Sequence, residues 1–258
     1  MSTNPYATPK TDAADAGSAL QGNFVPEGHT VPAGHGWTWI AAAWDLFKRA
    51  PVVWIGMVLT FAVIFCVLAF IPILGSLVSF ALGPVFGAGF VIGCRALDEG
   101  GELKFGHLFA GFQTRFGTLV AVGLLYLAAS FVVMLVVGLI AGVSMFAIFW
   151  GGADPANIGV AFATMGLAFL VVTALMLPVV MAIWFAPPLV VFNELGAFDA
   201  LKASFLGCLK NMVSFLVYGL ILFGFAILAS IPFGLGWLVL APVIGTSIYT
   251  AYRDIYFR

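Results

Sequence analysis

Long apolar runs with few charged residues alternate with short turns along most of the chain. A helix needs about 20 apolar residues to cross the roughly 30 Å hydrocarbon core of a bilayer. Six runs reach about this length and predict membrane-spanning helices at about residues 52–72, 78–97, 117–144, 161–186, 212–232 and 236–253. Short turns such as Ile71–Ser76 join the runs in pairs, so the pattern predicts three helical hairpins.

Prolines interrupt the fourth run, at Pro178 and at Pro187–Pro188. Proline has no backbone N–H and its ring clashes with the preceding helical turn, so we expect these residues to kink or end the fourth helix. A re-entrant segment at Pro187–Pro188 is an alternative that the sequence leaves open.

A shorter amphipathic segment precedes each predicted hairpin, at about residues 37–49, 105–115 and 197–210. The first has an apolar stripe at helical spacing, formed by Trp37, Ile40, Trp44 and Phe47. Aromatic stripes opposite basic residues suit helices that lie in the headgroup plane; packing on the helix bundle is the alternative. The predicted fold class is therefore all-α: a six-span membrane helix bundle of three hairpins, each preceded by a cytoplasmic-side amphipathic helix.

The first 36 residues differ from the rest because they are polar and rich in Pro, Gly, Ala and Thr. Such a segment buries too little surface to fold alone, so we predict a disordered cytoplasmic tail at 1–36 and a membrane domain at 37–258. Glu27, His29 and His35 form a weak metal-binding pattern in this tail, and we interpret both histidines as solvated.

Composition and charge support the membrane assignment and give it an orientation. The chain is 63% hydrophobic and 8% charged, whereas soluble domains are about 45–50% apolar and about 25% charged. The 10 Lys and Arg residues lie in the N-terminal segment, at or after the ends of the second and fourth spans, or at the C-terminus. Because positive charge favours the cytoplasm, both termini are predicted to be cytoplasmic. A net charge of −1 gives no basic field for nucleic acid.

Two of the hairpins share a sequence pattern. Phe70–Asp98 and Ser230–Asp254 each contain Ile-Pro, a glycine-containing turn and a second proline. An arginine follows 11 residues after that second proline in both, at Arg95 and Arg253. The pattern predicts an internal repeat. Such repeats are common in membrane proteins that move substrates, but duplication alone also produces them.

Charged residues at the predicted cytoplasmic ends suggest ion pairs. The expected pairs are Arg95 with Asp98 or Glu99, Arg253 with Asp254, and Glu194 with an arginine of a neighbouring unit. The alternative is that long charged side chains extend separately to the membrane surface.

Glycines in the second predicted span raise the question of a nucleotide site. Gly87, Gly89 and Gly93 form G-x-G-x-x-x-G. A dinucleotide-binding turn needs an acidic residue about 20 positions further on, and Gln113 and Thr114 stand there instead. Small residues allow helices to pack closely in lipid, so we interpret these glycines as helix contacts. The related spacing G-x-x-x-G occurs at Gly83 and Gly87, at Gly89 and Gly93, and at Gly138 and Gly142.

Motifs of known catalytic sites are absent from the sequence. It contains no H-E-x-x-H, G-x-S-x-G, C-x-x-C or phosphate-binding G-K-[ST] pattern, and no carboxylate or basic residue lies near the middle of a predicted span. Cys66, Cys94 and Cys208 fit small apolar positions rather than a disulfide framework. We therefore predict no catalytic, cofactor-binding or metal-binding residue, no cofactor and no enzymatic activity.

Three strings resemble a family of uncharacterised bacterial, mostly proteobacterial, multi-pass inner-membrane proteins. They are GHGWTWIAAAWDLFKRAP from Gly34, HLFAGFQ from His107 and IGTSIYTAYRDIY from Ile244. The wider order of amphipathic helix and hairpin, in threes, resembles the membrane domains that accompany some glycerophosphodiester phosphodiesterases. The resemblance implies a bacterial inner-membrane location and carries over no activity and no functional residue.

The leading hypothesis is a non-catalytic membrane scaffold or interaction protein that acts on envelope lipids or partner proteins. The alternative is a transporter or channel for an apolar or amphipathic small molecule, and an intramembrane enzyme comes third. The expected partners are the lipid bilayer and other membrane proteins or a second copy of the chain. A closed, dry bundle would favour the scaffold, whereas a central cavity bordered by kinked helices would favour the transporter.

Overall fold

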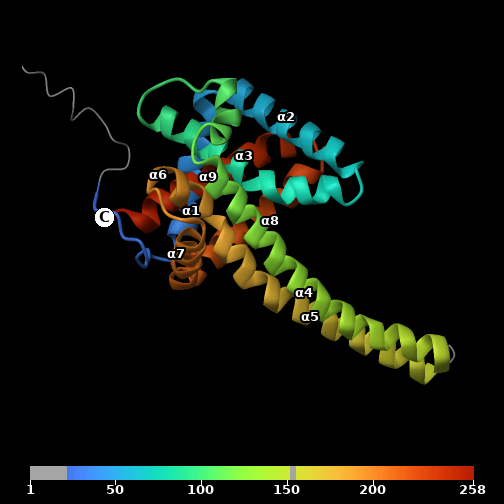
Figure 1. Ribbon diagram of the computed structural model, residues 1–258. Helices are drawn as coiled ribbons and strands as arrows, with labels where there is room; N and C mark the ends of the chain where they lie inside the picture. The colour runs from blue at the N-terminus through green and yellow to red at the C-terminus, as the bar shows by residue number, and fades with distance from the viewer. Residues whose placement is uncertain (1–21, 152–154) are drawn as a thin grey trace, which may run out of the picture.

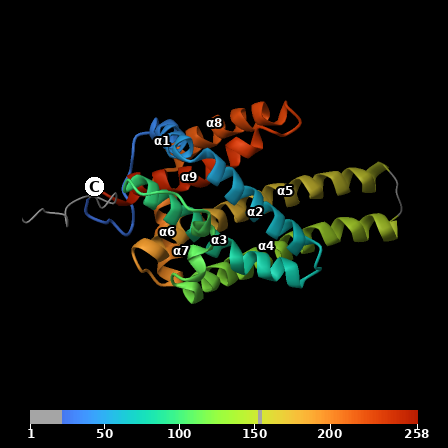
Figure 2. The ribbon, with the colours of Figure 1, turned by 90° about the horizontal axis from the view of Figure 1, so that it is seen from above.

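The computed structural model describes residues 22–151 and 155–258, and this part of the chain is helical almost throughout (Figure 1 and Figure 2). In chain order, its elements are α1 (His35–Arg49), α2 (Pro51–Ala69), α3 (Leu74–Asp98), the 3₁₀ helix η1 (Phe105–Phe112), α4 (Phe116–Gly151), α5 (Pro155–Trp184), α6 (Ala186–Phe192), α7 (Ala197–Lys210), α8 (Met212–Ser230) and α9 (Trp237–Tyr256). The predicted all-α class is confirmed.

Several of these helices are long and apolar enough to cross a membrane, so the chain is a multi-pass membrane protein. Within the described residues there are 5 such stretches, Pro51–Ala69, Leu74–Asp98, Phe116–Gly142, Ile158–Phe192 and Met212–Ser230. The sixth predicted span, now α9, is not among them. Its second half is rich in hydroxyl and charged side chains, including Thr246, Thr250 and Arg253, which lower its hydropathy.

Three helix pairs extend from one side of the structure. α2 packs on α3, α4 on α5 and α8 on α9, and Figure 2 shows the far ends of all three pairs pointing away from the C-terminus. The α4–α5 pair reaches well beyond the other two (Figure 1). Its first helix has 36 residues, which corresponds to a length of about 54 Å.

Each short helix that precedes a helix pair packs against the second half of a different pair. α1 lies along α9, η1 lies on α3, and α7 lies along α5 and α6. The three pairs are thereby joined in a closed ring, with α3 touching both α6 and α9 in the middle. The contact of α1 with α9 closes this ring. There, Thr246 donates a hydrogen bond to the Ala43 carbonyl (3.3 Å) and Thr250 donates one to the Trp39 carbonyl (2.9 Å).

Glycines allow η1 and α3 to touch through their backbones. A Cβ placed on Gly89 would lie 2.3 Å from the Leu108 carbonyl oxygen. One placed on Gly111 would lie 2.0 Å from the Val85 carbonyl oxygen, and one on Gly93 would also meet a neighbouring side chain at 2.7 Å. The interpretation of Gly89 and Gly93 as close-packing positions is confirmed, and both lie inside α3 rather than in a phosphate-binding turn. It is wrong for Gly83, Gly138 and Gly142, because no described atom lies within 4 Å of a Cβ at these positions.

The structure corrects the predicted apolar stripe of α1. The buried side chains of this helix are Trp39, Ile40, Ala43, Leu46 and Phe47, with Gly36 buried as well. Trp37 and Trp44 instead are 51% and 43% exposed. Because α1 lies against both α8 and α9, its buried side is wider than a single stripe and is turned toward these helices. α1 therefore packs on the bundle, and Trp37 and Trp44 of the predicted stripe lie on its exposed side.

Of the other two predicted amphipathic segments, one has the predicted bounds and the other is shorter and forms a 3₁₀ helix. The segment predicted at 105–115 is a 3₁₀ helix that ends at Phe112, and the close backbone approach of Gly111 to α3 accompanies this tighter geometry. α7 has the predicted bounds, Ala197–Lys210.

Residues 22–34 pair with the C-terminal part of the chain. The Val25 N–H donates to the Tyr256 carbonyl (2.8 Å), and the Val31 N–H donates to the Asn211 side-chain oxygen (2.8 Å). The predicted disorder is therefore wrong for this segment, because its backbone finds partners on α9 and at the start of α8. The residues before it lie outside the described part of the chain.

The two histidines of this region are held by the fold rather than solvated. His35 Nδ1 lies 2.7 Å from Asp254 Oδ2, which also accepts a hydrogen bond from Trp39 Nε1 at 2.7 Å. His29 is partly buried, and this burial, together with the positive charge of Arg258, lowers its pKa from the ordinary value of 6.5. Across the described residues, no group of three or more His, Cys, Asp or Glu side chains is placed to hold a metal ion.

The substitution Gly111→Ala tests the backbone contact between η1 and α3. The new methyl group would meet the Val85 carbonyl, so the two elements must separate, and we expect a loss of about 1–3 kcal/mol in stability. The measurement is the melting temperature of the detergent-solubilised protein. Gly138→Ala is the matched control, because no described atom lies within 4 Å of a Cβ at that position. Equal melting temperatures for the two variants would contradict the contact.

Candidate functional site

The long apolar stretch that begins with α5 breaks between α5 and α6. The Ser204 hydroxyl of α7 accepts a hydrogen bond from the Phe185 N–H (2.9 Å) and donates one to the Met181 carbonyl (2.7 Å). It thus replaces the backbone hydrogen bond of that turn. Pro187 and Pro188 follow and have no N–H with which to continue the α5 ladder. The interruption expected at these two prolines is confirmed, whereas the earlier proline lies inside α5 without ending it.

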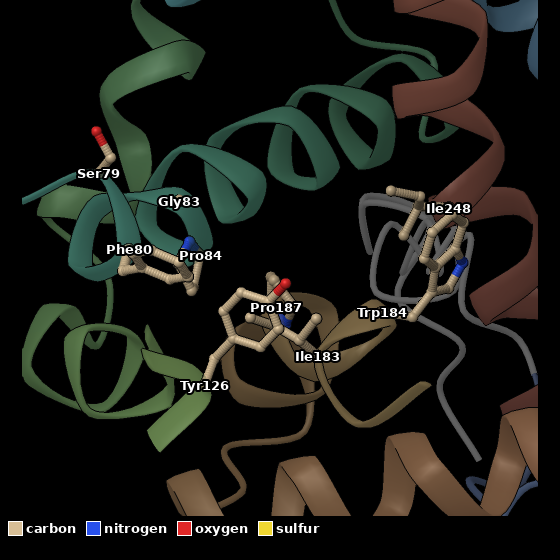
Figure 3. A pocket seen from close by; sticks show the side chains of 9 residues that line it. All are labelled: Ser79, Phe80, Gly83, Pro84, Tyr126, Ile183, Trp184, Pro187 and Ile248. Atoms are coloured by element: carbon tan, nitrogen blue, oxygen red, sulfur yellow. The ribbon is translucent and has the colours of Figure 1, made fainter. Parts of the chain in front are cut away.

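An open-sided cavity of about 400 Å³ lies beside this break and is lined by helices of all three pairs. Its lining residues, shown in Figure 3, are Ser79, Phe80, Gly83 and Pro84 of α3, Tyr126 of α4, Ile183 and Trp184 of α5, Pro187 of α6 and Ile248 of α9. None of them is charged, so the walls are apolar apart from a few hydroxyl, indole and backbone groups. Pockets of this size and character suit apolar or amphipathic small molecules.

Prolines border the cavity on two sides. Pro84 lies inside α3 and Pro187 lies in the first turn of α6. Pro187 Cγ is 3.4 Å from a Cβ placed on Gly87, so α3 and α6 come into contact at the edge of the cavity. Figure 3 shows Trp184 and Ile248 together at one end of the cavity, away from the α3 side chains.

Tyr126 forms the α4 side of the cavity. Its ring packs against Phe80 of α3, with ring centroids 5.5 Å apart. The contact depends on a close approach one turn earlier, where a Cβ on Gly123 would lie 2.3 Å from the Phe80 carbonyl oxygen. Tyr126 therefore brings a hydroxyl group into an otherwise apolar wall, where it could orient the polar end of a ligand.

Polar side chains join α3, α6 and α9 at the ends of these helices that lie nearest the C-terminus. The Asp98 carboxylate forms an ion pair with Arg253 and accepts a hydrogen bond from the Tyr249 hydroxyl (3.0 Å). The Tyr252 hydroxyl donates to the Asn193 side-chain oxygen. These contacts link α9 to both α3 and α6, so they fix the three central helices to one another at this end.

Two of the expected ion pairs have different partners in the structure. Arg253 pairs with the carboxylate of α3 rather than with its neighbour in sequence, because the ends of α3 and α9 meet. Glu194 faces Arg115 of its own unit, at 3.9 Å, rather than an arginine of a neighbouring unit. The pair of Arg95 with Glu99 is confirmed, with Nε and Oε1 2.7 Å apart.

The lining of the cavity is only partly visible in the sequence. Pro187 stands out as a helix breaker, but Ser204 acts on a backbone group 19 residues away and has no motif of its own. Tyr126 and Trp184 are two aromatic residues among many. Only the packing of three helix pairs brings them to one cavity, so no sequence pattern could have selected them.

Comparison with known proteins gives a family and no activity. The family model described as Protein of unknown function (DUF975) matches residues 46–258. A protein of Burkholderia thailandensis, described as a probable inner membrane protein, is 30% identical over 228 residues, which are 85% of this chain and 82% of that protein. No solved structure matches the chain. The likeness to membrane domains of glycerophosphodiester phosphodiesterases stays a resemblance, since neither match bears on it.

The substitution Asp98→Asn tests the junction of α3 and α9. The Asp98 side chain is 16% exposed. Asparagine carries no negative charge, so Arg253 would lose its ion-pair partner, and we expect a loss of about 1–3 kcal/mol in stability. Asp45→Asn is the control, because Asp45 pairs with Lys48 but is 65% exposed, and such surface pairs contribute at most about 1 kcal/mol. The measurement is the melting temperature of each variant in the same detergent. If the Asp98 variant is as stable as the control, the junction of α3 and α9 contributes little to the stability of the protein.

Proposed function

Because the chain belongs to the family described as Protein of unknown function (DUF975), whose description assigns no activity, we propose a function from the cavity. The protein binds an apolar or amphipathic small molecule between its three helix pairs and moves it within or across the membrane. The observation that carries this proposal is the cavity of about 400 Å³ beside the broken helix α5–α6. In membrane proteins, interrupted helices are tolerated where they line a cavity, and they often form substrate sites there.

The residues that line the cavity favour ligand binding without catalysis. The lining residues in the described part of the chain include no carboxylate, histidine, cysteine or lysine. Such a wall has neither a general base of ordinary strength nor a metal ligand set. We therefore propose that the protein is not an enzyme, and that the hydroxyl of Tyr126 orients the ligand by a hydrogen bond.

We propose six spans in three hairpins, with α9 as the sixth span. α9 pairs with α8 and returns to the end of the structure where α1 begins (Figure 2). Hydroxyl groups of Thr246 and Thr250 are turned toward the α1 backbone, so part of its polar surface is satisfied inside the protein. A helix of moderate hydropathy can cross a membrane when its polar groups have partners inside the protein.

The membrane and the orientation are also proposals. The relative from Burkholderia thailandensis, described as a probable inner membrane protein, supports the bacterial inner membrane. Arg95 and Arg253 lie in the last turns of α3 and α9, and Arg115 directly precedes α4, so none of the three lies in the α2–α3 or α8–α9 turn. By the positive-inside rule, these helix ends face the cytoplasm, together with both chain termini.

The geometry of two turns supports the proposed internal repeat. Ile73 and Phe233 each follow an Ile-Pro pair and have positive φ angles of 62° and 52°, which L-residues rarely adopt. Shortly after them, Gly75 and Gly236 lie against the preceding helix, where an added Cβ would come within 1.8 Å and 2.4 Å of its backbone. The α2–α3 and α8–α9 turns thus share a positive φ angle directly after Ile-Pro, followed by a close-packed glycine two residues later in the first turn and three residues later in the second.

A scaffold is the second candidate, favoured by the far part of the α4–α5 pair. Phe146, Phe149 and Trp150 are 62%, 81% and 74% exposed. α4 is also much longer than the roughly 30 Å of hydrocarbon that a span must cross. This long apolar surface could bind another membrane protein or a second copy of the chain.

Reporter fusions test whether α9 crosses the membrane. A reporter that is active only in the periplasm, inserted after Gly234 in the α8–α9 turn, is expected to be active, and the same reporter fused after Arg258 is expected to be inactive. A cytoplasmic reporter should give the opposite pattern. Equal activity at the two positions would place both ends of α9 on one side and exclude the sixth span.

Photolabelling tests the cavity as a binding site. Palmitic acid bearing a diazirine, added to the protein in liposomes, should label residues of the cavity in a saturable manner that unlabelled palmitic acid reverses. Gly83→Phe should fill the cavity, because no described atom lies within 4 Å of a Cβ on Gly83. We expect about tenfold weaker labelling of the cavity in this variant, the effect of roughly 1.4 kcal/mol.

The control for this experiment is Gly138→Phe, at an equally open position on α4 that is not among the residues lining the cavity. It should leave the labelling of the cavity unchanged. Labelling that is restricted to the outer surface and does not saturate would contradict the binding site. If a membrane protein also crosslinks to α4 or α5 in stoichiometric amounts, that result favours the scaffold.

A further inference from the structure

We infer that Trp184 closes a passage through which the ligand reaches the cavity sideways, from the bilayer, between α5 and α8. The inference rests on the proposed function and adds to it the route of the ligand, the residue that controls this route and the class of ligand that can use it. That class is a molecule with a single apolar chain that is already dissolved in the membrane.

A second, larger cavity lies on the lipid side of Trp184. It has a volume of about 660 Å³ and is formed by α5, the end of α7 and α8. Leu177, Val213 and Leu216 on its rim are 52%, 63% and 63% exposed. All three lie in stretches that are long and apolar enough to cross a membrane. The second cavity is therefore continuous with the surface that contacts lipid, and an acyl chain can enter it without crossing polar surface.

Trp184 is shared by both cavities. It lines the central cavity together with Ile248 and lines the lipid-side cavity together with residues of α8. Figure 3 places it at the end of the central cavity. Its indole ring meets the edges of Phe215 and Tyr218 on α8, at centroid distances of 6.2 and 6.4 Å. The side chain thus stands between the two spaces and spans the gap from α5 to α8.

The ring rests against a fixed surface on α8. The Tyr218 hydroxyl lies 2.6 Å from the Ser247 hydroxyl of α9, which holds the Tyr218 ring in place. Phe215 is packed from its other side by Trp39 of α1, at 5.2 Å. A change in the width of the passage must therefore come from the Trp184 side chain rather than from α8.

The backbone around Trp184 is suited to such a movement. Trp184 is the last residue of α5, and the carbonyl of Trp184 has no N–H partner four residues on, because Pro188 stands there. The following residue, Phe185, bonds to the Ser204 hydroxyl instead of to its own helix. A rotation of the Trp184 side chain therefore breaks no backbone hydrogen bond, whereas a shift of the end of α5 would disturb the bonds of Ser204 to Phe185 and Met181.

The two cavities also limit what can pass. Among the described residues that line either space, none is charged. A charged group would lose its hydration without gaining a partner, whereas an apolar chain loses nothing on leaving the lipid. This argues for an amphiphile whose apolar chain enters first, and against an ion or a sugar.

The test measures the rate at which the cavity residues, chiefly Phe80 and Tyr126, are labelled after diazirine-bearing palmitic acid is added to the protein in liposomes. Trp184→Ala should raise this rate several-fold by opening the passage. Gly219→Phe should lower it several-fold, because Gly219 lines the lipid-side cavity and has open space around an added Cβ.

Gly224→Phe is the matched control on the same helix, since it has similar open space but does not line that cavity. It should leave the rate unchanged. If the cavity is labelled in a saturable manner at the wild-type rate in every variant, the proposed passage is contradicted and the proposed binding site is supported. If no variant shows labelling of the cavity, both the binding site and the passage are wrong.

Discussion

The packing of each short helix against a different helix pair holds this protein together. Between helices in lipid, apolar contact alone gives little drive for association, so close backbone approach and hydrogen bonds must supply it. The three contacts of the ring use these means in different ways. Gly111 brings η1 against the α3 backbone, Thr250 ties α9 to the α1 backbone, and Ser204 ties α7 to the α5 backbone. These contacts add to the direct contacts between the helix pairs, such as those of α3 with α4 and with α9.

One of these contacts also stabilises the helix break beside the cavity. Ser204 joins α7 to α5 by occupying the place of a backbone hydrogen bond, and so it stabilises an open turn in the same helix. In an apolar surrounding, an unpaired N–H or carbonyl would cost several kcal/mol. The hydroxyl satisfies one group of each kind. The interruption beside the cavity is therefore part of the assembly of the ring, and the two cannot be changed independently.

The sequence predicts the parts of this structure that depend on local chemistry. Membrane-crossing stretches follow from the length of apolar runs, and the end of α5 follows from Pro187 and Pro188, because proline acts on its own helix. Features set by distant partners are not predictable in this way. Trp39 rather than Trp37 is buried in α1 because α8 and α9 both lie against that helix. The polar segment from residue 22 has no apolar pattern, yet Val25 finds a backbone partner on Tyr256.

The closure of the ring by α1 and α9 has a consequence for biosynthesis. The ribosome makes α1 before α9, so α1 waits for this partner until all of the helices between them have been translated. During that time, Trp39, Ile40 and Phe47 lack the surface that buries them in the finished protein. Lipid or the insertion machinery must cover them in the interval. The docking of α1 onto α9 can therefore begin only after α9 has been translated.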